Sequence, residues 1–393
     1  MLTRRRFLQS SALLALAPTV PMFVARTARA AGADPDRRAL VVVQLDGGND
    51  ALNTVVPYAD PSYERLRPKL KIARKDLVRL DDALGLHPSL KPLDRLLQAG
   101  QLAVIPGVGY PNPNRSHFES MAVWHTARTD AQERQGYGWL GRALDPSAGT
   151  AYMVGAAVSP ALWGRRATAV ALGRVEDTLL TDPAAAKLSV GPATADDLHA
   201  FLRRQAVDAY AAADRLAKLT AATDDAAYPA TGFAGRLQLV ARLLKSDLGA
   251  RVFYTTQPGY DTHAEQAFTH DRLLAEFAGA VAAFFEDLAA AKLAERVALL
   301  AFSEFGRTIR ENGSAGTDHG TAGVVFLAGP GVCWGVSGTM PSLTDLEAGE
   351  PKMTADFRRV YAAVLADWLG LPPQAALGAG FYRLPVIRRP GMP

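Results

Sequence analysis

Short apolar runs rich in β-branched residues recur along this chain and alternate with segments that have helical spacing. A continuous apolar run with little polar alternation predicts a strand that is buried on both faces of a sheet. Strands that alternate with helices predict an α/β protein with a mainly parallel central sheet flanked by helices. The runs are ALVVVQLDGGND (39–50), LAVIPGVGY (102–110), RVFYTTQPGYDTH (251–263), RVALLAFSEFGR (296–307) and GVVFLAGPGV (323–332).

Helical spacing and composition shifts mark the other segments. We expect the last of the helices below to begin at Thr354 and to end at Gly370. A Gly/Ala/Val-rich stretch at about 150–190 favours an inserted β segment, and Ala/Leu/Arg patterns at about 195–248 favour a helical insertion. The three clearest amphipathic helices are expected at 114–127, 264–294 and 354–370.

The first 30 residues predict a targeting signal. They combine an Arg-rich start, a short apolar stretch and a small-residue end at Ala28-Arg29-Ala30. The start, TRRRFL (3–8), resembles a twin-arginine export signal, and the apolar stretch is too short for a stable membrane span. We therefore expect export to the periplasm or the medium, and a single α/β domain over residues 31–393.

The export segment also accounts for the basic character of the chain. Of its 43 Lys and Arg residues five lie in residues 1–30, so the remainder carries 38 basic and 39 acidic side chains. A balanced charge gives no reason to expect binding to nucleic acid or to an anionic membrane. Cys333 is the one cysteine, which excludes a disulfide within the chain.

Acidic and imidazole side chains stand where the predicted strands end or begin. Asp46, Asp261, His263 and Glu304 lie at strand ends, and His319 precedes the last strand. The carboxyl ends of parallel strands share one edge of a sheet, where α/β proteins bind their ligands. Three carboxylates and two imidazoles suit zinc or manganese in a mononuclear or dinuclear hydrolytic site.

Each of these residues also has a simpler interpretation. Asp46 is suited to capping the glycine turn that follows it, and Asp261 to capping a helix that begins near Ala264. Asp318 is either a further ligand or a carboxylate that orients His319. We expect the other scattered histidines to be exposed or hydrogen-bonded: His87, His125, His199 and His270.

A hydroxyl and several cationic or amide side chains complete the candidate site. Ser116 stands in NPNRSHFE (112–119) at a predicted helix start, where free N–H groups and the helix dipole favour a nucleophile that carries a phosphoryl or sulfuryl group. The same letters form the capping box S-x-x-E, which requires no catalysis. We expect Asn114, Arg115 or Arg307 to bind the oxyanion, the arginines through paired N–H donors.

Five motifs together resemble an exported bacterial family, domain of unknown function 1501. They cover nearly the whole chain: LDGGNDALNTVVPY, NRSHFESMAVWHTA, GYDTH, SEFGRT and TDHGTAGVVFLAGPGV. This family is more distantly similar to the alkaline phosphatase and sulfatase superfamily. The resemblance implies an alkaline-phosphatase-like three-layer sandwich.

The superfamily resemblance also implies roles for individual residues. Asp46 would bind metal from the first strand, and Ser116 would be the nucleophile. Asp261 and His263 would hold one ion, and His319 would be the last ligand.

The sequence departs from the superfamily pattern at the Asp-His-Gly that should follow a further strand. Glu304-Phe305-Gly306 stands there, so Glu replaces Asp and Phe305 replaces a metal-binding His. The spacing from Asp261 to His263 is also shorter than in most relatives. These departures predict that one of two metal ions is weakly held or absent.

These observations favour an exported hydrolase of phosphate or sulfate esters that uses a divalent metal (zinc, manganese or calcium), as one ion or two. Its substrate would be a small molecule or a polymer ester. The alternative is a non-catalytic periplasmic protein on the same fold that binds an exported protein partner, because related genes often stand beside another exported family. A glycan hydrolase that uses Asp46 and Glu304 as its two carboxylates leaves the histidines without a role.

Overall fold

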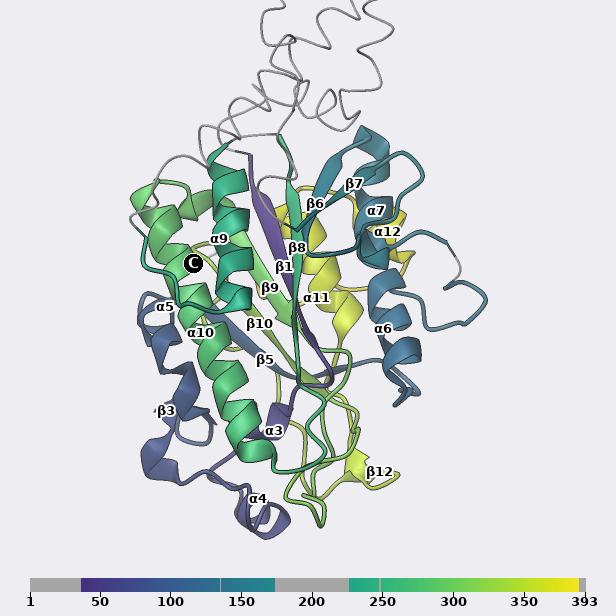
Figure 1. Ribbon diagram of the computed structural model, residues 1–393. Coiled ribbons are helices and arrows are strands. Elements are labelled where there is room, and N and C mark those ends of the chain that lie inside the picture. The colour runs from purple at the N-terminus through teal and green to yellow at the C-terminus, as the bar shows by residue number, and fades with distance from the viewer. Residues whose placement is uncertain (1–36, 135, 174–225, 247–248, 389–393) are drawn as a thin grey trace, which may run out of the picture.

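A central sheet organises the part of the chain that the computed structural model describes, which is residues 37–134, 136–173, 226–246 and 249–388 (Figure 1). Its nine strands lie in the order β11-β5-β10-β9-β1-β8-β6-β7, with β14 paired to β5. The strands are β1 (Ala39–Asp46), β5 (Leu102–Gly109), β6 (Thr150–Val154), β7 (Thr168–Leu172), β8 (Val252–Pro258), β9 (Val297–Phe302), β10 (Gly323–Ala328), β11 (Gly335–Val336) and β14 (Ala355–Asp356).

The direction of the strands decides where the loops gather. β1 pairs in parallel with β8 and β9, and β10 runs antiparallel to both β9 and β5. Among the strands that the structure describes in this sheet, β10 is the one that runs against the rest. Its first residues therefore lie at the same edge as the carboxyl ends of β1, β5, β8 and β9. The expected α/β fold with a mainly parallel sheet is confirmed.

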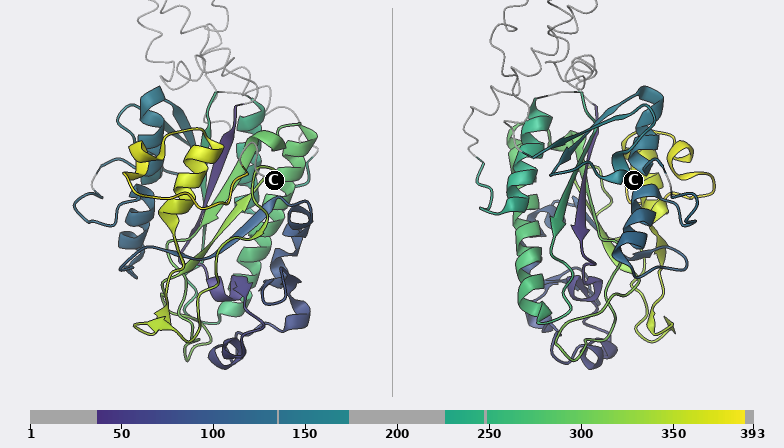
Figure 2. Two further views of the ribbon diagram at one scale, coloured as in Figure 1. Left: turned by 180° about the vertical axis from the view of Figure 1, so that it is seen from behind. Right: turned by 45° about the vertical axis from the view of Figure 1, so that its right-hand side comes forward.

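Helices cover both faces of the sheet and give a three-layer arrangement (Figures 1 and 2). One face is covered by α5 (Asp94–Gln98), α9 (Gly232–Lys245) and α10 (Gln266–Ala290). The other is covered by α6 (His117–Thr126), α7 (Trp139–Leu144), α11 (Phe357–Ala363) and α12 (Pro373–Leu377). The remaining elements are short: α3 (Ala51–Thr54), α4 (Pro61–Leu66), a small sheet of β2 (Val55–Val56), β4 (Gly85–Leu86) and β3 (Val78–Arg79), and the pair β12 (Leu346–Glu347) and β13 (Glu350–Pro351).

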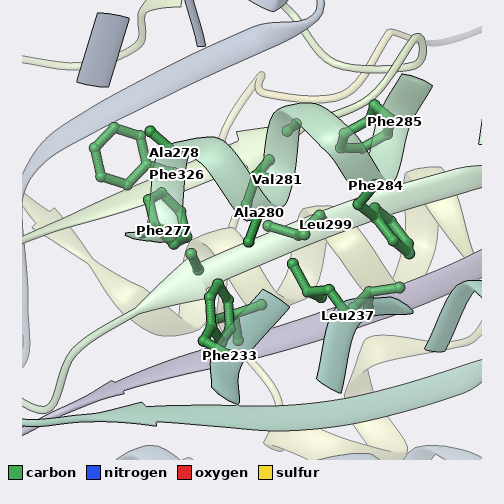
Figure 3. Close-up of a cluster of buried hydrophobic side chains, with 14 of the residues drawn as sticks. Phe233, Leu237, Phe277, Ala278, Ala280, Val281, Phe284, Phe285, Leu299 and Phe326 are labelled. Atoms are coloured by element: carbon green, nitrogen blue, oxygen red, sulfur yellow. The ribbon is translucent and has the colours of Figure 1, made fainter. Parts of the chain in front are cut away.

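Two hydrophobic clusters, one on each face of the sheet, hold these layers together. In the first, α10 presents an apolar stripe at helical spacing to the sheet and to α9 (Figure 3). β-branched side chains of β1 alternate between the two clusters, as the pleat of a strand buried on both faces requires. The stripe and its neighbours include Phe277, Val281 and Phe284 of α10, Phe233 and Leu237 of α9, Leu299 of β9 and Phe326 of β10.

The helix predicted at 354–370 corresponds to α11 and begins later than its sequence suggested. Thr354 does not cap it, because its hydroxyl donates to the carbonyl of Thr339 at 2.6 Å and its N–H donates to the carbonyl of Gly107. Asp356 is the N-cap, and its side chain accepts from the N–H of Arg358. A π-helical segment, Val364–Trp368, follows α11 before the left-handed Gly370.

Several expectations fall wholly or partly outside the described residues. The predicted signal at residues 1–30 and His199 lie outside them, as does most of the segment 195–248. Of the expected β segment at 150–190, the described part supplies β6 and β7, which extend the central sheet. No helix in the described ranges is long and apolar enough to cross a membrane.

A buried ion pair connects the loop after β1 to more distant segments. Asp50 and Arg67, whose side chains have no exposed surface, contact each other at 2.6 Å. Arg67 also donates to the carbonyls of Thr308 and Ile309, each at 2.8 Å. Gln266 of α10 donates to Asp50 at 2.5 Å. Although burial opposes ionisation, Arg67 lowers the pKa of Asp50 to about 2, so the carboxylate is charged.

We predict that Arg67→Met destabilises the protein by about 3–5 kcal/mol, because it leaves the buried charge of Asp50 without its partner. The measurement is the free energy of unfolding from denaturant titration. The matched control is Lys71→Met, which removes an exposed pair with Glu64 and should change stability by less than about 1 kcal/mol. Equal effects of the two substitutions would contradict the role given to the buried pair.

A buried histidine makes stability depend on pH. His270 of α10 is almost completely buried, and its Nε2 lies 2.9 Å from Oδ1 of Asn49. Burial disfavours the charged imidazole and lowers the pKa of His270 to about 3, against about 6.5 in an unfolded chain. The unfolded state therefore binds more protons than the folded state between these two values.

We expect the contribution of His270 to stability to be complete above about pH 6.5 and to decline as the pH falls toward 3. His270→Gln removes this titration. The stability difference between the parent and the variant should therefore shrink as unfolding is measured from about pH 7 down to about pH 4. A difference that does not change with pH would show that His270 has an ordinary pKa in the folded protein.

Candidate metal centre

Glycines allow the loops at this edge of the sheet to come unusually close together. Gly47, directly after β1, has φ +120°, and a Cβ added to it would lie 2.5 Å from the backbone nitrogen of Asp261. A Cβ on Gly316 would lie 2.2 Å from the carbonyl oxygen of His263. Both distances are too short for any side chain. The loops that follow β1 and β8 and the loop that precedes β10 can therefore pack backbone against backbone only because of these residues.

The guanidinium of Arg307 lies buried at the centre of these loops. Its side chain has no exposed surface, and it contacts Asp261 at 2.7 Å. Every nitrogen donates to protein: Nε to Gly48 O at 2.7 Å, Nη1 to Thr317 O at 3.0 Å, and Nη2 to Tyr260 O at 2.9 Å, to Gly47 O and to Asp261 Oδ1. Arg307 thus joins the loops after β1 and β8 to the loop between β9 and β10.

Three imidazoles converge on one carboxylate oxygen at this point. Nε2 of His263 lies 3.0 Å from Oδ1 of Asp261, Nε2 of His319 lies 3.1 Å from it, and Nε2 of His117 lies 3.5 Å from it. The nitrogens of His263 and His319 are 3.0 Å apart. The donor atoms of His117, Asp261 and His319 all lie within 4.8 Å of one another.

The second nitrogen of each imidazole contacts an oxygen that can only accept a hydrogen bond. Nδ1 of His117 contacts Glu304 at 2.8 Å, and Nδ1 of His263 contacts Asp318 at 3.1 Å. Nδ1 of His319 contacts the carbonyl of Arg115 at 2.8 Å. Each Nδ1 therefore carries the proton, and in the neutral ring the lone pair lies on Nε2.

This geometry fits a metal ion. Ligands about 2.0–2.1 Å from a tetrahedral zinc lie about 3.3 Å from one another, and the distances to Asp261 bracket that value. Lone pairs on His263 and His319 repel each other at 3.0 Å, and a shared cation removes the repulsion. Nε2 of His117 is buried and has no hydrogen-bond partner, although buried polar atoms normally have one. Carboxylates and a carbonyl behind the imidazoles are the usual outer partners of metal-binding histidines.

His117 is a site residue that the sequence did not reveal. It directly follows Ser116, and the capping-box pattern explained that stretch without it. The feature of the sequence that could have revealed His117 is its position at a predicted helix start, directly after the expected nucleophile Ser116. Phe305, which stands where the resemblance required a histidine, packs against the rings of His117 and His319 with centroid distances of 5.0 and 4.8 Å. A third imidazole thus comes from α6 rather than from the segment after β9.

Glu304 and Asp46 lie beside the converging donors without joining them. The side chain of Glu304 is completely buried, and its Oε1 accepts from the N–H of Gly47 at 2.9 Å as well as from His117. Its Oε2 accepts from Ser303. Asp46 is exposed, and it accepts from the amide of Gln44 at 3.2 Å. Partial desolvation and the nearby charge of Glu304 raise the pKa of Asp46.

The segment before α6 leaves a free hydroxyl beside these residues. Ser116 occupies the N-cap position of α6, but its side chain makes no capping hydrogen bond. Its N–H donates to Oδ1 of Asn114 at 2.8 Å. Glu119 pairs with Arg134 at 2.6 Å, so the capping box expected from the sequence does not form. The side chain of Arg115 is partly exposed, and its guanidinium lies 4.0 Å from Glu350.

Of the scattered histidines, those in the described residues are buried and hydrogen-bonded. Nε2 of His125 lies 3.0 Å from Oε1 of Gln44, and burial lowers the pKa of His125 to about 4. Nδ1 of His87 accepts from the N–H of Ser89 at 3.1 Å. They stay apart from the converging set, as does His270.

Hydrogen bonds and neighbouring charges in the site shift the pKa values of several of its side chains, and they favour the ionised form of the carboxylates of Asp261 and Asp318. Although desolvation opposes it, the hydrogen bond and the positive charge of Arg307 lower the pKa of Asp261 to about 2. The hydrogen bond to Glu304 raises the pKa of His117. The hydrogen bond to His263 lowers the pKa of Asp318. A cavity of about 770 Å³ opens beside this set, and Asp46, His117 and Asp261 form part of its lining.

We predict that Arg307→Lys destabilises the protein by about 2–4 kcal/mol even though it keeps the charge. An ammonium has three donors on one atom and cannot reach four carbonyls and a carboxylate on different loops. Denaturant unfolding of the variant is the measurement. Arg310→Lys is the matched control, because Arg310 lies in the same loop but is exposed to solvent and should tolerate the change. Unfolding free energies that agree for the two variants would show that the charge of Arg307 matters and its donor geometry does not.

The solved structures that resemble this chain have low sequence identity to it. No curated protein matches the chain. Solved structures similar to it include the C-terminal periplasmic domain of EcEptC from Escherichia coli in complex with zinc, with 10% identity and a TM-score of 0.40 over 76% of this chain and 75% of that chain. The lipoteichoic acid synthase LtaP from Listeria monocytogenes has 11% identity and a TM-score of 0.35 over 82% and 76%. The 2-O GAG sulfatase BT1596 has 9% identity and a TM-score of 0.37 over 76% and 65%.

The family comparison covers most of the chain. Residues 37–367 match the model of the family described as "Protein of unknown function (DUF1501)". The resemblance that the five motifs indicated is confirmed, and the chain belongs to the DUF1501 family.

Proposed function

We propose that this protein is an exported, metal-dependent hydrolase of phosphate or sulfate esters. The observation that carries the proposal is the convergence of three Nε2 atoms on Oδ1 of Asp261, at 3.0, 3.1 and 3.5 Å. Export is supported by the pattern of residues 1–30. The family itself has no assigned activity.

The converging donors define the proposed ligands of one ion. His117, His263, His319 and Asp261 would hold it, while Glu304 and Asp318 orient the imidazoles from behind. Three nitrogens and one carboxylate favour zinc or manganese over calcium, which prefers oxygen donors. When bound, such an ion supplies a Lewis acid that stabilises negative charge on an ester oxygen.

The residues around the ligands supply the other functions of a hydrolase. Oγ of Ser116 would attack phosphorus or sulfur, because its hydroxyl makes no capping bond and lies where the dipole of α6 favours an oxyanion. Arg115 and Asn114 flank it and would contact the remaining oxygens of the ester. Arg307 is better placed for another role than oxyanion binding: it positions Asp261.

Asp46 would act on the leaving group from the wall of the cavity. Its pKa is raised by partial desolvation and by Glu304, which favours a carboxyl group that can deliver a proton. As the bond from Ser116 Oγ to the central atom forms, the hydroxyl proton of Ser116 passes to water, the bond to the ester oxygen breaks, and that oxygen takes the proton of Asp46. Water would then attack the central atom and break its bond to Oγ, which takes a proton back from that water as the acid leaves. We place Asp46 outside the ligand set for this reason, and Glu304 because its carboxylate contacts Nδ1 of His117.

We predict near-stoichiometric zinc or manganese in protein purified from its export compartment, measured by elemental analysis. His117→Ala and His319→Ala should each lower the metal content severalfold or more, because each removes one of four ligands. His125→Ala is the control, since His125 is a buried histidine that contacts Gln44 rather than Asp261. Full metal in His117→Ala would contradict the ligand set proposed from the geometry.

The hydrolytic half of the proposal has its own test on the metal-bound protein. Ser116→Ala should keep the metal and lose at least about a hundredfold of any turnover of 4-nitrophenyl phosphate or 4-nitrophenyl sulfate. Bound metal with no turnover of a wide ester panel would instead support the non-catalytic alternative, a periplasmic protein that keeps one ion and binds a partner.

A further inference from the structure

The cavity beside the proposed metal centre has a largely apolar side. Asp46, His117 and Asp261 form one part of its lining. The rest includes Phe118, Met121, Ala122, Pro160 and Trp163. An ester bound at the metal centre would have its oxyanion near the first group and the remainder of the molecule near the second.

Two of the apolar residues expose aromatic rings to this cavity. Phe118 is 89% exposed and Trp163 is 50% exposed. A single exposed aromatic residue requires no explanation, but neighbouring exposed aromatic residues at a concave surface are typical of binding sites. Tyr137 lies close to the backbone of Trp163, because the N–H of the next residue, Gly138, donates to the carbonyl of Trp163 at 2.8 Å.

The position of Trp163 is fixed by direct backbone packing. A Cβ added to Gly141 would lie 2.0 Å from the carbonyl oxygen of Trp163, and one added to Gly138 would lie 2.1 Å from that of Pro160. The turn that carries Trp163 thus rests on the start of α7 with no side chain between them. A backbone held in this way needs no rearrangement when a ligand binds, which lowers the cost of binding.

The position of Phe118 follows from that of the metal centre. It is the residue after His117, whose ring is held by Glu304 at 2.8 Å. Consecutive Cα atoms lie about 3.8 Å apart, so the start of α6 brings a proposed ligand and an exposed aromatic ring to one place. A group bound against Phe118 therefore lies within the reach of one small molecule from the metal centre.

The polar side chains on this side of the cavity already have protein partners. The hydroxyl of Thr126 donates to the carbonyl of Ala122 at 2.6 Å. His125 contacts Gln44 at 3.0 Å. Arg134 is paired with Glu119. A hydroxyl-rich sugar would find few free donors or acceptors here, whereas a flat apolar ring needs none.

We propose that Phe118 and Trp163 form a subsite for an aromatic ring of the substrate, so that the protein acts on aryl esters in preference to small alkyl esters. The inference rests on the proposed function, since it assumes that the ester oxyanion binds at His117, Asp261 and His319. Tight packing of an aryl group against two rings would contribute affinity through buried apolar area and ring–ring contact.

Two phosphonates that carry the same anion test this directly. Isothermal titration of the metal-bound protein with phenylphosphonate and methylphosphonate compares their Kd values without any turnover, because the C–P bond is not hydrolysed. We expect phenylphosphonate to bind at least about tenfold more tightly. Phe118→Ser and Trp163→Ser should each reduce this ratio about threefold or more and leave the Kd of methylphosphonate unchanged.

Matched controls come from aromatic residues of the same types that are also exposed, but elsewhere. Phe268 is 77% exposed and Trp334 is 65% exposed, and neither lines this cavity. Phe268→Ser and Trp334→Ser should leave the ratio as it is in the parent. Metal content and the unfolding midpoint, measured for all four variants, show that each is folded and loaded.

The outcomes separate the subsite from the proposed function. Equal binding of the two phosphonates, with no effect of Phe118→Ser or Trp163→Ser, would overturn the aryl subsite and leave the oxyanion site standing. Binding of neither phosphonate to metal-loaded protein would overturn the oxyanion site itself, and the subsite with it. A ratio that falls in the two cavity variants and holds in the two controls is the result that the proposal requires.

Discussion

The buried guanidinium of Arg307 is the interaction on which the rest of the site depends. Carbonyl groups of three separate loops point toward it, and without a donor these buried oxygens would be left unsatisfied. Its charge is balanced by Asp261, which is thereby held where three imidazoles contact it. A fully buried side chain thus decides whether the donors converge.

The buried guanidinium of Arg307 also accounts for the two glycines after β1 and for the packing around them. Gly47 and Gly48 present their carbonyls to Arg307, and any side chain on Gly48 would collide with Phe305 at 2.3 Å. Phe305 in turn supports two of the imidazoles. The apolar ring at position 305 therefore links the glycine turn after β1 to two of the converging imidazoles.

Sequence reasoning located the elements better than the contacts between them. The five apolar runs became β1, β5, β8, β9 and β10, because a long β-branched run has few alternatives to a buried strand. The edge of the sheet that carries the site followed from the same pattern.

Which acids contact the imidazoles could not be predicted from the sequence. The end of a strand locates a side chain only to within several ångströms, whereas a contact between two side chains depends on differences of about one ångström. Glu304 was predicted as a ligand from its strand end, and the structure places its carboxylate against Nδ1 of His117. His117 itself was hidden because only the packing of α6 on the end of β9 brings it to Asp261.

That packing ties the position of α6 to the same residue that orients its histidine. The carbonyl of Glu304 accepts from Ser120 at 2.6 Å and from Nε1 of Trp124 at 2.8 Å, while its carboxylate holds His117. Trp124 also stacks on Phe302 of β9, with ring centroids 4.8 Å apart. A shift of α6 along the sheet would break all of these contacts together. Ser116, His117 and Phe118 are consecutive at the start of that helix, so the proposed nucleophile, a proposed ligand and the aryl contact are positioned as one unit by the core beneath them.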